Sequence, residues 1–223
     1  MLLEALNVPN IAFNADDSEE EGQGNGGFFE GLCTAHEPRE SDLIFTKEAG
    51  IFWYTPAIQG NFLAFDIETT GFSDADHVTC VCAYNPERSV KFSRCLQRGE
   101  VCEPFLKLLD EAPVLSAFNG VKFDIPFLVK RWAIPEWRAH MWTVKLVDPF
   151  QTCKLVLGQT FSLDRLLHSN GIETKTSNGA EAVLMAKEGR WEELADYCMQ
   201  DTMKTHQVLS LKKIKIPCNH VLI

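Results

Sequence analysis

The segment NFLAFDIETTG (residues 61–71) most constrains the fold, because it puts two carboxylates into what otherwise reads as a buried strand. Successive side chains of a strand point to opposite faces, so Leu63, Phe65 and Ile67 share one face, and Asp66 and Glu68 share the other. Burying two neighbouring carboxylates is costly unless an opposite charge compensates them. The pattern therefore leaves two interpretations: a solvated strand face, or a pair of ligands for a divalent cation.

The residues after this segment follow strand and helix patterns in turn. Strands are predicted over residues 77–84, 89–95, 113–119 and 143–148. Helices are predicted over residues 103–112, 124–132, 162–171, 179–189 and 191–213. A meander of strands followed by alternation with helices predicts an α/β fold, in which helices flank a mixed sheet.

Charge is distributed unevenly along the 223 residues. Residues 1–60 carry 2 Lys/Arg and 11 Asp/Glu, and therefore hold nine of the ten net negative charges. Within them, residues 14–27 are acidic and Gly-rich, which is typical of a disordered segment or a loop. We therefore expect an N-terminal extension (1–60) that is partly disordered around 14–27, a globular domain (61–213) and a C-terminal tail (214–223).

The eight cysteines are scattered, and no secretory signal or run of transmembrane length is visible. A cytoplasmic or nuclear protein with reduced, buried thiols is the favoured interpretation. Cys80 and Cys82 share a strand face and Cys218 lies near His220, which leaves a zinc site open, but the spacing matches no standard zinc pattern.

Three more residues follow the Asp66/Glu68 pair and point to one chemistry. Asp124 ends the turn NGVKFD, where it is either a helix cap or a ligand. Asp201 falls on the core-facing stripe of the last helix, where an unpaired carboxylate argues for a cation opposite it. Tyr197 lies one turn before Asp201 on the same helix face, where packing is the alternative role.

Four carboxylates converging from two strands and two helices suit phosphodiester hydrolysis. Two divalent ions roughly 3.5–4 Å apart can activate a water molecule and stabilise the leaving oxygen. Mg²⁺ and Mn²⁺ prefer oxygen ligands and keep positions open for a substrate phosphate. Such ions would also remove the repulsion between Asp66 and Glu68.

The motifs FDIETTG, NGVKFD and YCMQD resemble the three exonuclease motifs of the DEDD (DnaQ-like) superfamily of 3′–5′ exonucleases, in that order. The resemblance covers about residues 62–211 and includes SLDRLLHSNGI and GRWEELADYCMQD. It implies a ribonuclease H-like fold with a central mixed sheet and helices on both faces. It also implies hydrolysis at nucleic-acid 3′ ends, with release of nucleoside 5′-monophosphates.

The resemblance further implies a role for each motif residue. Asp66, Glu68, Asp124 and Asp201 would hold two Mg²⁺ or Mn²⁺ ions. The chain resembles the Tyr-type (DEDDy) branch, because Tyr197 stands four residues before the last Asp, and Asp196 stands where the other branch has a His. Tyr197 would orient the attacking water, since a hydroxyl with a pKa near 10 is a poor general base.

Contacts to the substrate are expected next to these motifs. Relatives hold the terminal nucleotide with residues at the positions of Thr69, Thr70, Gly71 and Phe72, and Phe72 would stack on a base. Asn119 and Lys122 are further candidates, although a turn and a solvated cation are their ordinary roles. For Asp148, at a strand end near the site, we favour structural capping.

Two other functions remain open from the sequence. One is a catalytically silent module that binds nucleic acid or a protein through the same fold. The other is an interaction protein that binds a partner through the acidic segment 14–27, which is compatible with nuclease activity. The sequence does not distinguish DNA from RNA, because the relevant contacts depend on the shape of the pocket.

Overall fold

The computed structural model describes residues 45–56, 58, 61–73, 75–174 and 179–217. Segment 14–27 and the pair Cys218 and His220 lie outside the described residues. The strands are β1 (Phe45–Glu48), β2 (Ile51–Tyr54), β3 (Leu63–Thr69), β4 (Val78–Asn85), β5 (Val90–Cys95), β6 (Leu115–Ser116), β7 (Leu146–Val147) and β8 (Ile214–Lys215). The helices are α1 (Glu103–Glu111), α2 (Asp124–Trp132), α3 (Glu136–Val144), α4 (Pro149–Leu157), α5 (Leu163–Ser169), α6 (Gly179–Glu188) and α7 (Trp191–Leu209).

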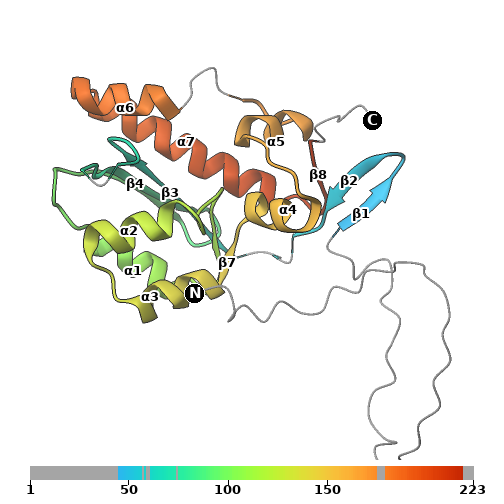
Figure 1. Ribbon diagram of the computed structural model, residues 1–223, viewed down its shortest axis with the longest axis horizontal. Coiled ribbons are helices and arrows are strands. Elements are labelled where there is room, and N and C mark those ends of the chain that lie inside the picture. The colour runs from blue at the N-terminus through green and yellow to red at the C-terminus, as the bar shows by residue number, and fades with distance from the viewer. Residues whose placement is uncertain (1–44, 57, 59–60, 74, 175–178, 218–223) are drawn as a thin grey trace, which may run out of the picture. The chain divides into compact units, whose positions relative to one another are not determined.

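The central sheet has the strand order β5-β4-β3-β6-β7. Strands β3, β4 and β5 form an antiparallel meander, whereas β6 pairs in parallel with both β3 and β7. Helix α7 lies on one face, with α6 beside it, and α1, α2 and α3 lie on the opposite side (Figure 1). The predicted α/β architecture, a mixed sheet with helices on both faces, is confirmed.

The two faces of β3 separate as the alternation of its side chains predicts. Leu63, Phe65 and Ile67 join a buried apolar cluster that includes Phe105 and Leu106 of α1. On the other face, the strand partners of Asp66 and Glu68 on β4 are Cys82 and Cys80. These cysteines pack with Leu194 and Cys198 of α7. The core therefore fixes the face of β3 on which the carboxylates lie, because sliding the strand by one residue would bury them against α1.

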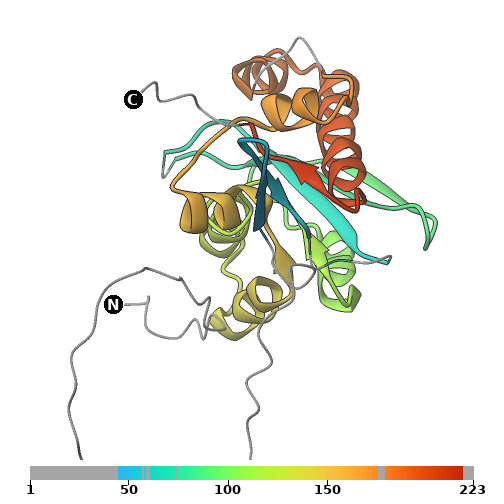
Figure 2. The ribbon, with the colours of Figure 1, turned by 90° about the vertical axis from the view of Figure 1, so that its right-hand side faces the viewer.

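A second, smaller sheet of order β1-β2-β8 joins distant parts of the chain (Figure 2). Its β1–β2 hairpin turns at Ala49 and Gly50, which both have positive φ, as a two-residue hairpin loop requires. Tyr54 of the hairpin is buried in one cluster with Phe62, Val208 and Ile214. Residues on both sides of positions 60 and 213 thus share one core, although the sequence assigned the hairpin to the extension and β8 to the tail.

Two predicted strands are mostly wrong, and of residues 113–119 only Leu115 and Ser116 form a strand. Residues 143–148 were expected to be extended, but Thr143 and Val144 end α3, and only Leu146 and Val147 form a strand. Thr143 and Val144, two of the β-branched residues that suggested a strand, are helical. The hydroxyl of Thr143 donates to the carbonyl of Ala139 within the helix. In the described ranges, no helix combines the length and the apolar character that crossing a membrane requires.

Candidate metal centre

The first motif lies on β3, on the sheet face that α7 covers. Asp66 and Glu68 are both half-buried, and carboxylate oxygens of the two residues lie within 4.8 Å of each other. The Sγ atom of Cys198 on α7 lies 3.7 Å from Oδ2 of Asp66. The pair therefore sits where the strand meets the helix, as the alternation of side chains predicts.

Asp124 is the first residue of α2 and is only 2% exposed. The backbone N–H of Ile67 on β3 donates to its Oδ1 atom at 3.2 Å, which fixes the carboxylate next to the first motif. The turn before it depends on Gly120, because a Cβ atom there would lie 2.5 Å from the Cβ of Ala117. Because position 120 has no side chain, the turn packs closely against Ala117, and Asp124 lies next to β3.

Helix α7 supplies the third part of the site. Asp201 is half-buried, whereas the ring of Tyr197, one turn earlier, is buried. Tyr197 precedes Asp201 by four residues on this helix, and the charge of Asp201 raises the pKa of the Tyr197 hydroxyl. Asp196, the residue before Tyr197, is exposed.

The electrostatics of the carboxylates show how closely they gather. Burial raises the pKa of Asp66 well above its usual value, and the charges of Glu68, Asp124 and Asp201 raise it further. Burial likewise raises the pKa of Asp124 to about 7, with a contribution from Asp148. Carboxylates separated by up to 135 residues in the sequence therefore repel one another across a single site. A bound cation would remove this repulsion.

The pKa of the Tyr197 hydroxyl is also raised. Burial and the negative charges of Asp201, Glu68 and Asp66 raise the pKa of its hydroxyl above the ordinary value of 10. The phenol therefore stays protonated at neutral pH and is available as a hydrogen-bond donor.

The donor atoms of the site fit Mg²⁺ or Mn²⁺. Four carboxylates supply the oxygen ligands that these hard cations prefer. Three of the four are half-buried and only Asp124 is fully buried, so coordination positions on the open side remain accessible to water and substrate. Asp66, Glu68, Asp124 and Asp201 are the side chains that could hold such ions.

The loop after the first motif is tightly organised around a residue that the sequence did not single out. Asp76 accepts hydrogen bonds from the Thr70 hydroxyl at 2.9 Å and from the backbone N–H and hydroxyl of Ser73 at 2.6 Å. These bonds lower the pKa of Asp76. A Cβ atom at Gly71 would lie 2.8 Å from the Asp76 carboxylate, so this close approach requires glycine. In the sequence, the only hint of this network is that Asp76 follows Thr70 by six residues, close enough for the loop to fold back on itself.

The remaining loop residues differ in their availability. Thr69 is buried, and its hydroxyl donates to the carbonyl of Gly71. Phe72 is 85% exposed, with only an edge contact to Phe123 at 5.5 Å between ring centroids. Arg131 of α2 donates to the carbonyl of Ser73 and holds the loop from the other side. A large apolar ring thus stands in solvent on an anchored loop.

The turn residues named as substrate contacts have structural partners. Asn119 has a positive φ, its N–H donates to Asp148, and its Oδ1 accepts from Gln151 at 2.6 Å. Asp148 caps α4 by accepting from the N–H of Gln151 and also accepts from Val121, so the predicted capping role is confirmed. Lys122 is exposed on the same turn. Asn119 is half-buried and held by Asp148 and Gln151, whereas Lys122 is exposed.

The comparisons with known proteins agree with this fold. Residues 63–211 match the family model of the RNase_H superfamily, and the chain belongs to that superfamily. Among solved structures, the family B DNA polymerase from the hyperthermophilic archaeon Pyrobaculum calidifontis is similar, with a TM-score of 0.55 and 16% identity. The match covers 67% of this chain but only 24% of the polymerase, so the chain corresponds to about a quarter of that protein. No curated protein matches the sequence.

Proposed function

We propose that the protein is a metal-dependent 3′–5′ exonuclease of the Tyr-type DEDD branch. The observation that carries the proposal is the gathering of Asp66, Glu68, Asp124 and Asp201 into one electrostatically strained site on an RNase H-like fold. Superfamily membership and the likeness to a DNA polymerase support a nucleic-acid substrate. The order of the three sequence motifs supports the exonuclease branch.

The four carboxylates would hold two Mg²⁺ or Mn²⁺ ions. Bound there, such ions lower the pKa of a water molecule and neutralise charge on the phosphate. The backbone bond from Ile67 to Asp124 keeps the α2 ligand in register with β3, so the ligand set is preorganised before substrate arrives. Hydrolysis would break the last phosphodiester bond and release a nucleoside 5′-monophosphate.

Tyr197 would act as an orienting donor and not as a base. Its raised pKa keeps the proton on the phenol, so the hydroxyl can donate a hydrogen bond. A phenol held there can hydrogen-bond the attacking water and fix its approach to phosphorus.

The terminal nucleotide would lie against the loop that carries Phe72. The network around Asp76 fixes this loop, so the exposed ring can stack on a base at little additional cost in conformational entropy. Lys122 lies on the neighbouring turn and could contact a phosphate.

The test is digestion of single- and double-stranded DNA and RNA, each labelled at the 5′ end in one sample and at the 3′ end in another. We expect ladders that shorten from the 3′ end with Mg²⁺ or Mn²⁺ and stop with chelator. Asp201→Asn should abolish this activity, and Asp196→Asn, an exposed carboxylate on the same helix, is the matched control. Retention of the wild-type rate in Asp201→Asn would refute the proposed site. Binding of the same oligonucleotides without cleavage would instead favour a silent module.

A further inference from the structure

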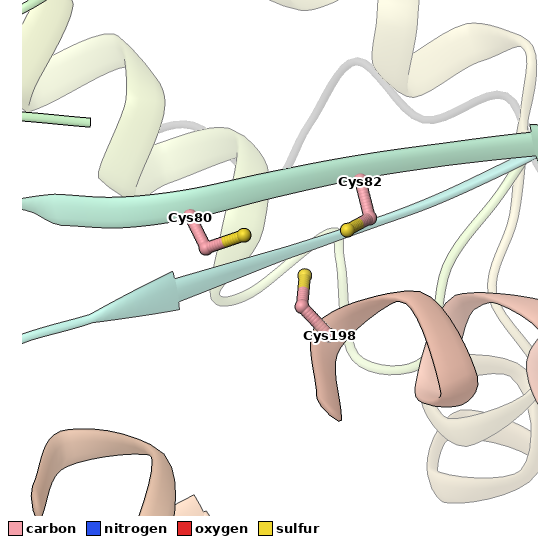
Figure 3. Close-up of side chains that lie close together, drawn as sticks. All are labelled: Cys80, Cys82 and Cys198. Carbon is pink, nitrogen blue, oxygen red and sulfur yellow. The ribbon is translucent and has the colours of Figure 1, made fainter. Parts of the chain in front are cut away.

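Three buried thiols meet beside the carboxylates, at a point that the proposed nuclease chemistry does not use. Cys80 and Cys82 project from the same face of β4, and Cys198 projects toward them from α7 (Figure 3). All three residues are fully buried, and their Sγ atoms lie within 4.8 Å of one another. The sequence placed Cys80 and Cys82 on one face but did not bring Cys198 to them. We call these three residues the thiol cluster.

The spacing of the thiol cluster suits a tetrahedral metal ion. A zinc–sulfur bond of about 2.3 Å in tetrahedral geometry puts neighbouring sulfur atoms roughly 3.8 Å apart. The observed limit of 4.8 Å is about one ångström longer, which small rotations about χ1 can close. The cysteines also come from a strand and a helix that the core already holds together, so little chain entropy is lost on binding.

Asp66 can supply an oxygen ligand to the thiol cluster, and its side of the site also offers a path for the metal ion. Oδ2 of Asp66 lies 3.7 Å from Sγ of Cys198, and Asp66, Glu68 and Cys198 offer a second set of donor atoms within 4.8 Å. Asp66 and Glu68 are half-buried and not sealed, so an ion can reach the sulfur atoms from the open side of the carboxylates. The two sets share Cys198, so Asp66 meets the thiol cluster through that residue. Asp66 would have to shift toward Cys80 and Cys82 to complete a tetrahedral set, which zinc accepts from sulfur and carboxylate ligands.

We propose that the thiol cluster, with Asp66 as the oxygen ligand, binds a thiophilic divalent cation of the Zn²⁺ type and thereby inhibits the neighbouring catalytic centre. Sulfur ligands favour Zn²⁺ over Mg²⁺ and Mn²⁺, so the two adjacent sites select different metals. An Asp66 carboxylate drawn to a sulfur-bound ion is no longer placed to serve the oxygen-only site. The inhibitory part of this inference rests on the proposed function, whereas the binding part does not.

Binding can be measured without any nuclease assay. Reduced, metal-free full-length protein is titrated with Co²⁺, whose thiolate complexes absorb strongly in the near ultraviolet, and Zn²⁺ is then added in competition. We expect about one Co²⁺ per chain with this absorption, displaced by Zn²⁺. Because removing even an outer-shell partner weakens metal binding by 10–100-fold, Cys198→Ala should weaken Co²⁺ binding roughly tenfold or more.

Cys102→Ala is the matched control for the titration. Cys102 is equally buried but lies in the cluster on the other face of the sheet, so its removal should leave the absorption unchanged. If Cys198→Ala loses its native circular dichroism, Cys82→Ser replaces it as the test variant. Absence of thiolate absorption in the wild type, or equal absorption in the folded variant, overturns the proposal and leaves the thiols as core packing.

The inhibition is tested by adding Zn²⁺ during digestion with saturating Mg²⁺. For each protein, the rate with Zn²⁺ is divided by the rate without it, since Cys198 touches Asp66 and its loss can change the basal rate. We expect the Zn²⁺ concentration for half-inhibition to rise at least tenfold in Cys198→Ala and to stay unchanged in Cys102→Ala. Equal sensitivity of wild type and Cys198→Ala would mean that the carboxylates alone bind Zn²⁺, and would overturn the inhibitory role. If no protein cleaves any substrate, the proposed function fails while the Co²⁺ titration still decides whether the metal binds.

Discussion

Neutralising Asp124 should stabilise the metal-free protein, in contrast to most substitutions of a buried polar residue. Burial raises the pKa of Asp124 from 3.8 to about 7. A rise of about three pH units, at about 1.36 kcal/mol per unit, corresponds to about 4 kcal/mol of unfavourable ionisation above pH 7. Asparagine keeps an oxygen that can accept from the N–H of Ile67. Asp124→Asn should therefore raise the free energy of unfolding by up to about 4 kcal/mol at pH 8.

The sign of the pH dependence follows from proton binding. Between pH 3.8 and about 7, the folded state holds a proton on Asp124 that the unfolded state has lost. The wild type therefore loses stability as the pH rises through this range. The difference between variant and wild type should be largest above pH 7 and vanish below about pH 4.

Divalent cations should narrow the stability difference between Asp124→Asn and the wild type. Mg²⁺ at about 100 times its dissociation constant stabilises a protein that binds it by about 2.7 kcal/mol. The wild type should gain this stabilisation, and Asp124→Asn, which lacks one proposed ligand, should gain less of it.

The measurement is urea unfolding followed by tryptophan fluorescence at pH 5 and pH 8, with chelator and with Mg²⁺. Asp196→Asn, an exposed position, is the control and should track the wild type throughout. If Asp124→Asn proves no more stable than the wild type at pH 8 in chelator, Asp124 is not an electrostatically strained carboxylate and the reasoning is wrong.

Three further predictions follow from named contacts. Tyr197→Phe should lower the hydrolysis rate roughly 10–100-fold while Mg²⁺ stabilisation persists, because an orienting bond is lost and no ligand is; single-turnover rates and thermal shifts check this. Phe72→Ala should weaken binding of a single-stranded oligonucleotide by about 1–3 kcal/mol without changing stability, since the ring is exposed; equal affinities by fluorescence anisotropy would exclude stacking. Asp110→Ala should destabilise the protein by about 1–3 kcal/mol, because it removes the acceptor of the buried Trp142 indole N–H; unchanged urea midpoints would contradict this.

Partner binding by the acidic segment 14–27 can be tested with an N-terminal deletion, and the structure shows where that deletion should end. Deletion of residues 1–60 would remove the hairpin that pairs with β8 and buries Tyr54. Deletion of residues 1–44 spares these contacts, and therefore separates partner binding through residues 14–27 from loss of stability.

Local patterns in the sequence were sufficient for much of the fold. The bounds of α2 were predicted as they stand, since Asp124 and Trp132 enclose a short amphipathic stretch. The faces of β3 followed from alternation alone, because the period of a strand is two residues. Carboxylates on that strand and on the stripe of α7 were enough to suggest a shared cation, and the family resemblance then implied the complete set of four ligands.

Other elements depend on partners that are distant in the chain. The β1–β2 hairpin is an ordered sheet only because β8, some 160 residues later, pairs with it. Helix α3 carries Trp137, Met141 and Val144 at i, i+4 and i+7, but these residues are exposed, so the stripe does not mark the face that the core buries.

For the site, too, the sequence predicted the orientation of each residue on its own element but not which elements pack together. Chain spacing fixed which face of its own element each residue occupies, since that depends only on backbone periodicity. Which faces meet depends on packing between elements far apart in sequence. The approach of Cys198 to Cys80 and Cys82, and the bond from Ile67 to Asp124, were therefore decided by the tertiary structure alone.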